Sequence, residues 1–284
     1  MTAHARPRTL IATAIAVLST GCLPASWGAA ALLHPFRRPI TVARPADAQD
    51  VAFESDGLRL KGWWFRGTAP RRRTLVYLHG SADNRASGIF IAERFLARGF
   101  DVLAYDSRAH GESEGAACTY GYYEKGDLRR AIDLIGVQPV VVLGVSLGAA
   151  VALQAAADDP RIAAVVAVST FSDLRTVARE RAPVIATRGD IEAAFKLAEE
   201  QAHFKVDDVS PLVAARRIHV PVLLVHGDTD RETLPDHSRR VFAALTADKR
   251  LLLVPGAGHN DVLRPEVWTE IDAWLDRTSI ARGQ

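Results

Sequence analysis

The sequence contains little cysteine and carries almost no net charge, and each shortage excludes a class of protein. Two cysteines, Cys22 and Cys118, occur among 284 residues, so a disulfide framework does not hold this chain together. The formal net charge is +2, which leaves no strong basic field to attract nucleic acid. Repeats and low-complexity tracts are also missing. What is present is an ordinary globular composition, 48% hydrophobic and 24% charged, in a chain long enough to bury an ample core.

Residues 1–36 differ from the rest of the chain and are predicted to be a signal or anchor segment. Two arginines precede an apolar stretch, Leu10 to Leu18, and small residues follow it, which is the layout of a secretory signal. The sequence LSTGC resembles a bacterial lipoprotein box whose Cys22 would be lipidated, although Ser19 stands where Leu or a similar residue is usual. An uncleaved anchor helix over about 10–33 is the alternative. Both interpretations predict an exported protein that is tethered to a membrane of the bacterial cell envelope.

From about Val51 onward, apolar runs alternate with segments of helical periodicity. Two strand-like pieces around Asp56 and Gly57 predict a hairpin. The later apolar runs have no polar alternation and each precedes a helical segment, which indicates a doubly wound, mostly parallel sheet covered on both faces. The predicted strands lie within 74–80, 101–108, 140–144, 162–170, 220–228 and 250–258, and the predicted helices within 89–98, 121–135, 147–157, 236–245 and 265–276.

One span, residues 172–215, interrupts this alternation. It separates two predicted strands by more than the few residues that a crossover connection usually needs. Residues 190–201 within it have a helical pattern, but the span has no strand signals and is too short for a core of its own. We therefore expect a helical lid inserted over the sheet edge, within a single domain that comprises residues 37–284.

Ser146 lies between two glycines in GVSLG, where an apolar strand passes directly into an alanine-rich helix. Such a sharp turn strains the backbone of its apex residue, and side chains at Gly144 and Gly148 would collide there. The hydroxyl is therefore predicted to stand clear of the backbone at the carboxyl end of the strand, where ligands bind in parallel sheets. The backbone N–H of Leu147 begins the helix and would face negative charge beside that oxygen. This pattern is that of a nucleophile elbow.

A serine nucleophile needs a base, and the base needs an acid that orients it. Two loops that follow later apolar strands reach the same sheet edge as Ser146: one contains Asp228 and Asp230, and the other contains His259. For the acid both aspartates are candidates by position. The alternative for His259 is a loop residue bonded to the backbone. No pair of His or Asp residues has metal-ligand spacing on one element, so neither a metal nor another cofactor is expected.

Residues 51–276 resemble an α/β hydrolase, in the branch of serine esterases and lysophospholipases. The resemblance rests on the motifs HGSADN (79–84), YDSRAHGESEG (105–115), GVSLG (144–148), HGDTD (226–230) and GAGHN (256–260). It implies that Asp230, three residues after the glycine of HGDTD, is the acid. It also implies that the backbone N–H of Ser81 is a second oxyanion donor beside that of Leu147.

Several residues of these motifs are expected to be structural. The resemblance implies that the loop with Asp106, Arg108 and His110 fastens the sheet edge. His79 and His226 each precede a glycine at a strand end, and we interpret both as packing and turn-shaping residues. Asn84 is expected to brace its turn. Two interpretations of Cys118 remain open, a small buried hydrophobe or a residue that lines the cleft near Tyr120, Tyr122 and Tyr123.

The predicted activity is hydrolysis of carboxylic esters through Ser146, His259 and Asp230 and an acyl-enzyme intermediate. A small-molecule or lipid acyl ester is the expected substrate, because a membrane tether and the aromatic residues Phe195 and Phe204 of the insertion fit an apolar acyl group. These two aromatics could instead pack the insertion onto the sheet. Acyl transfer, peptide or amide hydrolysis, and a non-catalytic binding module are the alternatives. Serine in place of aspartate at the elbow excludes a dehalogenase of this fold.

Overall fold

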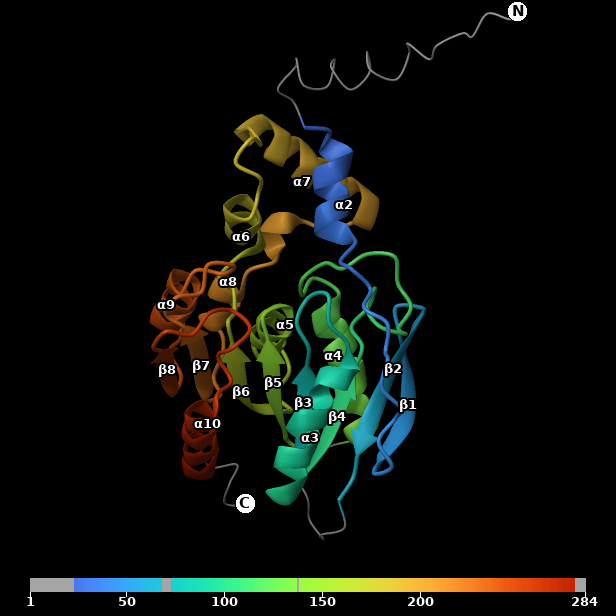
Figure 1. Ribbon diagram of the computed structural model, residues 1–284, viewed down its shortest axis with the longest axis vertical. Helices are drawn as coiled ribbons and strands as arrows, with labels where there is room; N and C mark the ends of the chain where they lie inside the picture. The colour runs from blue at the N-terminus through green and yellow to red at the C-terminus, as the bar shows by residue number, and fades with distance from the viewer. Residues whose placement is uncertain (1–22, 68–72, 137, 279–284) are drawn as a thin grey trace, which may run out of the picture.

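The computed structural model describes residues 23–67, 73–136 and 138–278, and a mostly parallel sheet forms the centre of this part. The strands are β1 (Ala48–Ser55), β2 (Leu58–Phe65), β3 (Arg73–Leu78), β4 (Phe100–Tyr105), β5 (Val140–Val145), β6 (Ile162–Val168), β7 (Val222–Gly227) and β8 (Lys249–Val254). Their order in space is β1-β2-β4-β3-β5-β6-β7-β8 (Figure 1). The pairs β1–β2 and β2–β4 are antiparallel and the others are parallel. The predicted fold class is confirmed.

The helices of the domain cover both faces of the sheet and enclose two apolar layers. One layer packs beneath α4, α5 and α9, and the other beneath α3 and α10. The inner strands have side chains buried on both faces, as in β4 and β7, and this explains why their sequences show no polar alternation. The bounds of these helices are α3 (Gly88–Ala97), α4 (Glu124–Ile135), α5 (Leu147–Ala156), α9 (Asp236–Ala244) and α10 (Pro265–Arg277).

The predicted hairpin is formed by β1 and β2, with Asp56 and Gly57 between them. Both residues have positive φ, 50° and 76°, as a two-residue turn that matches the strand twist requires. Glycine and aspartate tolerate this region better than most residues do. The hairpin therefore places an antiparallel edge on the parallel sheet.

The span after β6 is helical, as predicted, and lies beyond the carboxyl ends of the strands (Figure 1). It contains α6 (Leu174–Glu180), α7 (Arg188–Ala202), a short 3₁₀ turn (Val206–Asp208) and α8 (Pro211–Ala215). Helix α7 begins at a capping box. The side chain of Thr187 accepts the backbone N–H of Asp190, and the side chain of Asp190 accepts the backbone N–H of Thr187. Phe195 and Phe204 are buried in the apolar cluster of this span, so they pack the insertion together and onto the domain.

Helix α2 (Ala25–Leu33) packs against α7, so the structure over the sheet edge is built from two separate segments of the chain. The contact is close, because a Cβ at Gly28 would lie 2.6 Å from Cβ of Ala194. Ala29 and Leu33 are buried in the same apolar cluster as Phe195. Residues 25–33 fall within the segment that the sequence assigned to a signal or anchor, and here they belong to the folded body. Hereafter the cap means α2 together with α6 and α7.

The predicted signal sequence and lipidation at Cys22 fall on residues 1–22, which lie outside the described residues. Within the ranges that the structure describes, no helix has both the length and the apolar character needed to cross a bilayer. Export and tethering therefore stay predictions.

Candidate active site

The turn at Ser146 has the strained geometry that the sequence predicts. Ser146 lies between β5 and α5 with φ of 51° and ψ of −109°. A Cβ at Gly144 would come within 2.3 Å of the Gly148 carbonyl group, and one at Gly148 within 2.3 Å of the Leu78 carbonyl oxygen. Because these neighbours are backbone atoms that cannot swing away, both positions require glycine.

Three side chains from separate loops meet at this turn. Nε2 of His259 lies 3.0 Å from Oγ of Ser146, and Nδ1 of His259 lies 2.7 Å from Oδ2 of Asp230. All three side chains are at least nine-tenths buried. The structure thus brings together the three residues that the sequence singled out, in an unbroken hydrogen-bonded chain.

The carboxylate of Asp230 is held by its own turn. Its Oδ1 accepts the backbone N–H groups of Glu232 and Thr233, both at 2.9 Å. Burial alone would raise the pKa of Asp230. Hydrogen bonds from His226, His259 and Thr233 outweigh burial and hold this pKa well below its ordinary value. Asp230 is therefore ionised throughout the neutral range, and it faces the imidazole as a full negative charge.

The second aspartate of the motif, Asp228, has a different role. Its side chain is exposed, and its Oδ1 accepts the backbone N–H of Gly256 at 2.7 Å. This bond joins the two loops that carry Asp230 and His259. Of the two candidate acids, the structure brings Asp230 to the imidazole and makes Asp228 a turn cap.

Two backbone segments border the hydroxyl of Ser146, as predicted for the oxyanion donors. Leu147 is the first residue of α5, where helix N–H groups have no partner within the helix. The loop after β3 also passes close to Ser146, because a Cβ at Gly80 would lie 3.7 Å from Cβ of Ser146. Ser81 follows directly in this loop. The structure therefore brings both predicted donor segments to the serine.

Buried ion pairs stabilise the loop after β4, as expected. Asp106 accepts hydrogen bonds from the backbone and the guanidinium of Arg85, and from the backbone of Glu112 at 2.9 Å. Arg108 forms a bidentate pair with Asp127 at 2.5 and 2.7 Å. These groups fasten the loop to η1 (Arg85–Ser87) and to α4. None of them contacts Ser146 or His259.

The histidines at 79 and 110 also shape loops. Nδ1 of His79 donates to the Gly80 carbonyl at 2.7 Å, and its Nε2 accepts the N–H of Ser107 at 3.0 Å. The ring of His110 packs 5.1 Å from that of His79, and its Nδ1 donates to the Arg108 carbonyl at 2.9 Å. Burial, and then the neighbouring His79, lower the pKa of His110 from its ordinary 6.5 to about 4. His110 is thus neutral at neutral pH.

The remaining predicted residues are structural as well. Asn84 caps η1 by accepting the N–H of Ala86 at 2.9 Å, which braces its turn. Cys118 is fully buried in the apolar layer beneath α4 and α5, so it is a small hydrophobe and does not line a cleft. Its backbone N–H donates to the Leu33 carbonyl at 2.8 Å, which ties the end of α2 to the domain.

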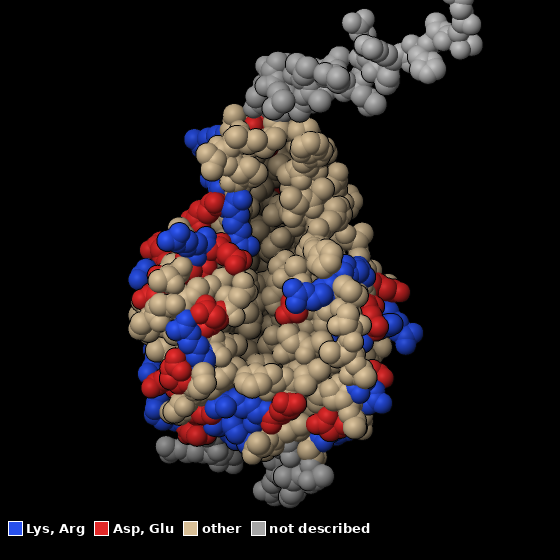
Figure 2. Space-filling view, viewed as in Figure 1, with Lys and Arg blue, Asp and Glu red and all other residues tan. Residues whose placement is uncertain are grey.

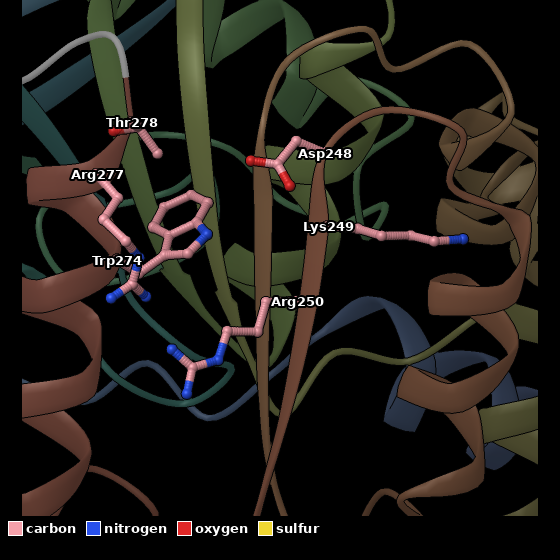
Figure 3. Close-up of a pocket in the computed structure, with 6 residues that line it drawn as sticks. All are labelled: Asp248, Lys249, Arg250, Trp274, Arg277 and Thr278. Carbon is pink, nitrogen blue, oxygen red and sulfur yellow. The ribbon is translucent and has the colours of Figure 1, made fainter.

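A hollow lined mostly by uncharged side chains runs down from the cap, whereas charges of both signs lie along the left side and the lower edge of the molecule (Figure 2). A separate cavity of 310 Å³ lies between β8 and α10 at the opposite edge of the sheet (Figure 3). Its lining residues are Asp248, Lys249, Arg250, Trp274, Arg277 and Thr278. This cavity is remote from Ser146, because it begins at the amino end of β8. In the described part of the chain, no three His, Cys, Asp or Glu side chains are grouped to hold a metal ion.

Comparison with known proteins identifies others that share this fold. Residues 73–204 match a family described as alpha/beta hydrolase fold. The structure superimposes on an esterase of Pyrococcus furiosus, Pf2001, with a TM-score of 0.68 and 23% identity, over 87% of this chain and 98% of the esterase. The chain therefore has the α/β-hydrolase fold.

Two further similarities cover most of this chain. The uncharacterized protein YfhR of Escherichia coli O157:H7 is 29% identical over 231 residues, which are 76% of this chain and 75% of YfhR. An acylaminoacyl peptidase of Pyrococcus horikoshii has a TM-score of 0.65 at 16% identity, and the match covers 81% of this chain but only 41% of the peptidase. At such identities the structural matches establish the fold alone.

Two contacts near the site were missed by sequence reasoning. Nε2 of His226, interpreted as a packing residue, lies 3.2 Å from Oδ2 of Asp230. Arg181, at the end of α6, donates to the Glu232 carbonyl at 2.8 Å and to Oγ1 of Thr233 at 2.5 Å. The spacing of four residues between His226 and Asp230, across one turn, could have predicted their contact. No pattern in the sequence pointed to Arg181.

Proposed function

We propose that this protein is a serine hydrolase that cleaves carboxylic esters with apolar acyl groups. The observation that carries the proposal is the hydrogen-bonded chain from Ser146 through His259 to Asp230. The strained elbow supports it, because backbone strain of this kind is retained where a side chain must be presented to a ligand. Ser146, His259 and Asp230 then act as nucleophile, base and orienting acid.

The reaction follows from the geometry. Oγ of Ser146 attacks the acyl carbonyl carbon while Nε2 of His259 accepts the hydroxyl proton. The resulting tetrahedral intermediate collapses, the ester C–O bond breaks, and the leaving alcohol takes the proton from Nε2. Water then attacks the acyl-enzyme with His259 again as base, and releases the carboxylic acid and the free serine. Throughout, Asp230 keeps the imidazole in one tautomer and stabilises its protonated form.

The oxyanion of each intermediate is assigned to the backbone N–H groups of Leu147 and Ser81. Both segments lie next to Ser146, and the positive end of α5 adds to the field there. Losing one such donor typically costs about 3 kcal/mol of barrier. Because both donors are backbone groups, the side chain of Ser81 need not take part.

The substrate class is proposed from the surroundings of the site. The cap is held by an apolar cluster that includes Ala150, four residues after Ser146, and Phe171, which follows β6. The end of β6 lies beside Ser146, because the Val168 carbonyl accepts the N–H of Ser146 at 2.8 Å. An apolar acyl group would meet few charged side chains on the hollowed surface beneath the cap. The esterase with the same fold supports esters over peptides, because it matches this chain over nearly its whole length. The peptidase carries more than half of its chain outside the matched domain.

The test is hydrolysis of p-nitrophenyl esters of two to eight carbons by the purified protein, with p-nitroanilides of the same acyl groups as the amide arm. Turnover of the esters is expected, and Ser146→Ala is expected to abolish it and the covalent labelling by a fluorophosphonate probe. Ser26→Ala, on the exposed face of α2, serves as the matched control and keeps both. Addition of an acceptor alcohol separates transfer from hydrolysis. Labelling that persists in Ser146→Ala contradicts the proposal, and absence of labelling in the wild type favours a binding module.

We also propose that the protein is exported to the cell envelope and is anchored there through residues 1–22. Support comes from the order of arginines, apolar stretch, small residues and Cys22 in the sequence. Mass spectrometry of the mature N-terminus after membrane fractionation tests it. A lipidated chain that begins at Cys22 is expected, and an unmodified soluble chain that begins at Met1 contradicts it.

A further inference from the structure

His226 contacts the same carboxylate oxygen that His259 contacts. It lies at the end of β7 and is fully buried, and its Nε2 is 3.2 Å from Oδ2 of Asp230. Nδ1 of His259 reaches that oxygen at 2.7 Å from the other side. The other oxygen, Oδ1, accepts two backbone N–H groups of the turn. Two imidazoles therefore share one oxygen of the acid.

The hydrogen-bond partners of His226 fix the orientation of its ring and place a hydrogen on Nε2. Nε2 lies 2.8 Å from the carbonyl oxygen of Thr233, which can only accept, so Nε2 carries the hydrogen. Nδ1 lies 2.6 Å from Oγ of Ser238, within hydrogen-bond distance of this hydroxyl. The orientation of the ring is set by contacts at both nitrogens. Its N–H is shared between the Thr233 carbonyl and the Asp230 carboxylate.

We propose that His226 is a positioning residue that orients Asp230 and tunes how strongly Asp230 holds the proton of His259. The inference rests on the proposed function, because it gives His226 a role through the acid of that mechanism. A donor on Oδ2 spreads the negative charge of the carboxylate, and so weakens its attraction for a protonated imidazole. Without this donor, His259 keeps its proton to higher pH and is available as a base over a narrower range.

The other charged or titratable groups around this turn are engaged elsewhere. Arg181 of α6 binds the backbone of Glu232 and the side chain of Thr233, not the carboxylate of Asp230. The remaining groups and their partners are Glu232 with Asn260, Asp228 with the Gly256 backbone, and His237 of α9 with Glu180. Since none of these contacts reaches Oδ2 of Asp230, the effect of His226 can be isolated by substituting it alone.

A purely structural role for His226 is the competing explanation, because the ring also joins β7 to α9 through Ser238. The two explanations differ in what they predict. Loss of a structural bridge lowers stability and leaves the pH dependence of the surviving activity unchanged. Loss of a positioning residue shifts the pH at which kcat/KM is half its maximum. A Gln side chain can place an N–H near the position of Nε2, whereas Leu cannot, so the two substitutions separate the donor from the bulk of the ring.

The experiment measures kcat, KM and the pH profile of kcat/KM on p-nitrophenyl butyrate for wild type, His226→Leu and His226→Gln. For His226→Leu, kcat is expected to fall about 10- to 100-fold with little change in KM. The acidic midpoint of kcat/KM is expected to rise by roughly half a pH unit or more. His226→Gln is expected to recover most of the lost kcat and most of the shift in the midpoint. His110→Gln removes another fully buried histidine, one with no contact to Asp230, and its midpoint should equal that of wild type.

The outcomes separate this inference from the proposed function. If wild-type turnover survives in Ser146→Ala, the proposed function fails, and the role of His226 fails with it. If turnover depends on Ser146 but His226→Leu keeps the wild-type kcat, or its midpoint is unchanged or lower, only the positioning role is overturned. Should His226→Leu not fold, His226→Met, which also lacks an N–H donor, is measured instead. A midpoint in His226→Met that equals that of wild type also overturns the role.

Discussion

Nε2 of His259 lies 3.0 Å from Oγ of Ser146, although 113 residues separate the two in the chain. Parallel strands make this meeting possible, since the carboxyl ends of β5 and β8 point to the same sheet edge and their loops extend over it. A substitution in either loop is therefore expected to act on the chemistry more than on the stability of the sheet.

The two aspartates of the HGDTD motif provide a matched pair for testing the acid. Asp230→Asn is expected to lower kcat about 10⁴-fold, because the amide favours the wrong tautomer of His259. Asp228→Asn changes an exposed side chain that accepts the backbone N–H of Gly256, and it should keep kcat within a few-fold of wild type. Steady-state kinetics on a p-nitrophenyl ester checks both. Equal losses in the two variants would contradict the assignment of Asp230.

Two glycines in helices are expected to respond in opposite directions to substitution by alanine. In Gly148→Ala the new Cβ would meet the Leu78 carbonyl oxygen at 2.3 Å, so stability should fall by about 2–3 kcal/mol and activity should fall with it. In Gly126→Ala, within α4, the Cβ meets nothing within 4 Å. Stability should then rise by about 0.5–1 kcal/mol, since alanine favours a helix. Urea unfolding measures both, and a neutral Gly148→Ala would disprove the close packing of the elbow.

The buried His110 predicts a pH dependence of stability. Its pKa is about 4 in the folded protein and 6.5 as its ordinary value, so the unfolded chain binds the proton first as the pH falls. Stability is therefore full above pH 6.5 and decreases from there down to about pH 4, by about 3 kcal/mol from this group. His110→Asn keeps a donor for the Arg108 carbonyl but does not titrate. The difference in unfolding free energy between wild type and His110→Asn should thus change with pH in this window, and a constant difference would refute the prediction.

Arg181 connects the cap to the turn that holds the acid. Its guanidinium binds both the carbonyl of Glu232 and the hydroxyl of Thr233, the two residues whose N–H groups fix Asp230. Arg181→Met is expected to lower kcat roughly fivefold, which corresponds to about 1 kcal/mol for a lost charged hydrogen bond at the surface. Arg188→Met, at the exposed start of α7, is the control and should match wild type. Identical kinetics in the two variants would show that this connection does not affect Asp230.

Much of the fold could be predicted because the information was local. Buried runs such as that of β5 lack polar alternation, and each ends where glycine or a helical pattern begins, so strands and helices were located within a few residues. The elbow was also local, since Gly144, Ser146 and Gly148 are close in sequence. Asp230 and His259 could be placed at the same edge because both follow apolar strands of one parallel sheet.

What could not be predicted depended on packing between distant segments. Helix α2 joins α7 through Gly28 and Ala194, and nothing in either helix alone identifies the other as its partner. The composition of α2 is small and apolar, and this made it look like the end of an anchor. His226 was assigned to packing because its partners Thr233 and Ser238 lie on a turn and a helix whose orientation only the tertiary structure sets.

Because α2 precedes β1 in the chain, this helix of the cap belongs to a segment separate from the sheet and the elbow. A chain shortened to begin at Ala48 would keep the strands and the three meeting side chains, yet would uncover the apolar face of α7 around Phe195. Helix α2 can therefore be exchanged without changing any residue of the sheet or of the elbow. Under the proposed function, such an exchange is expected to change which acyl groups the protein accepts.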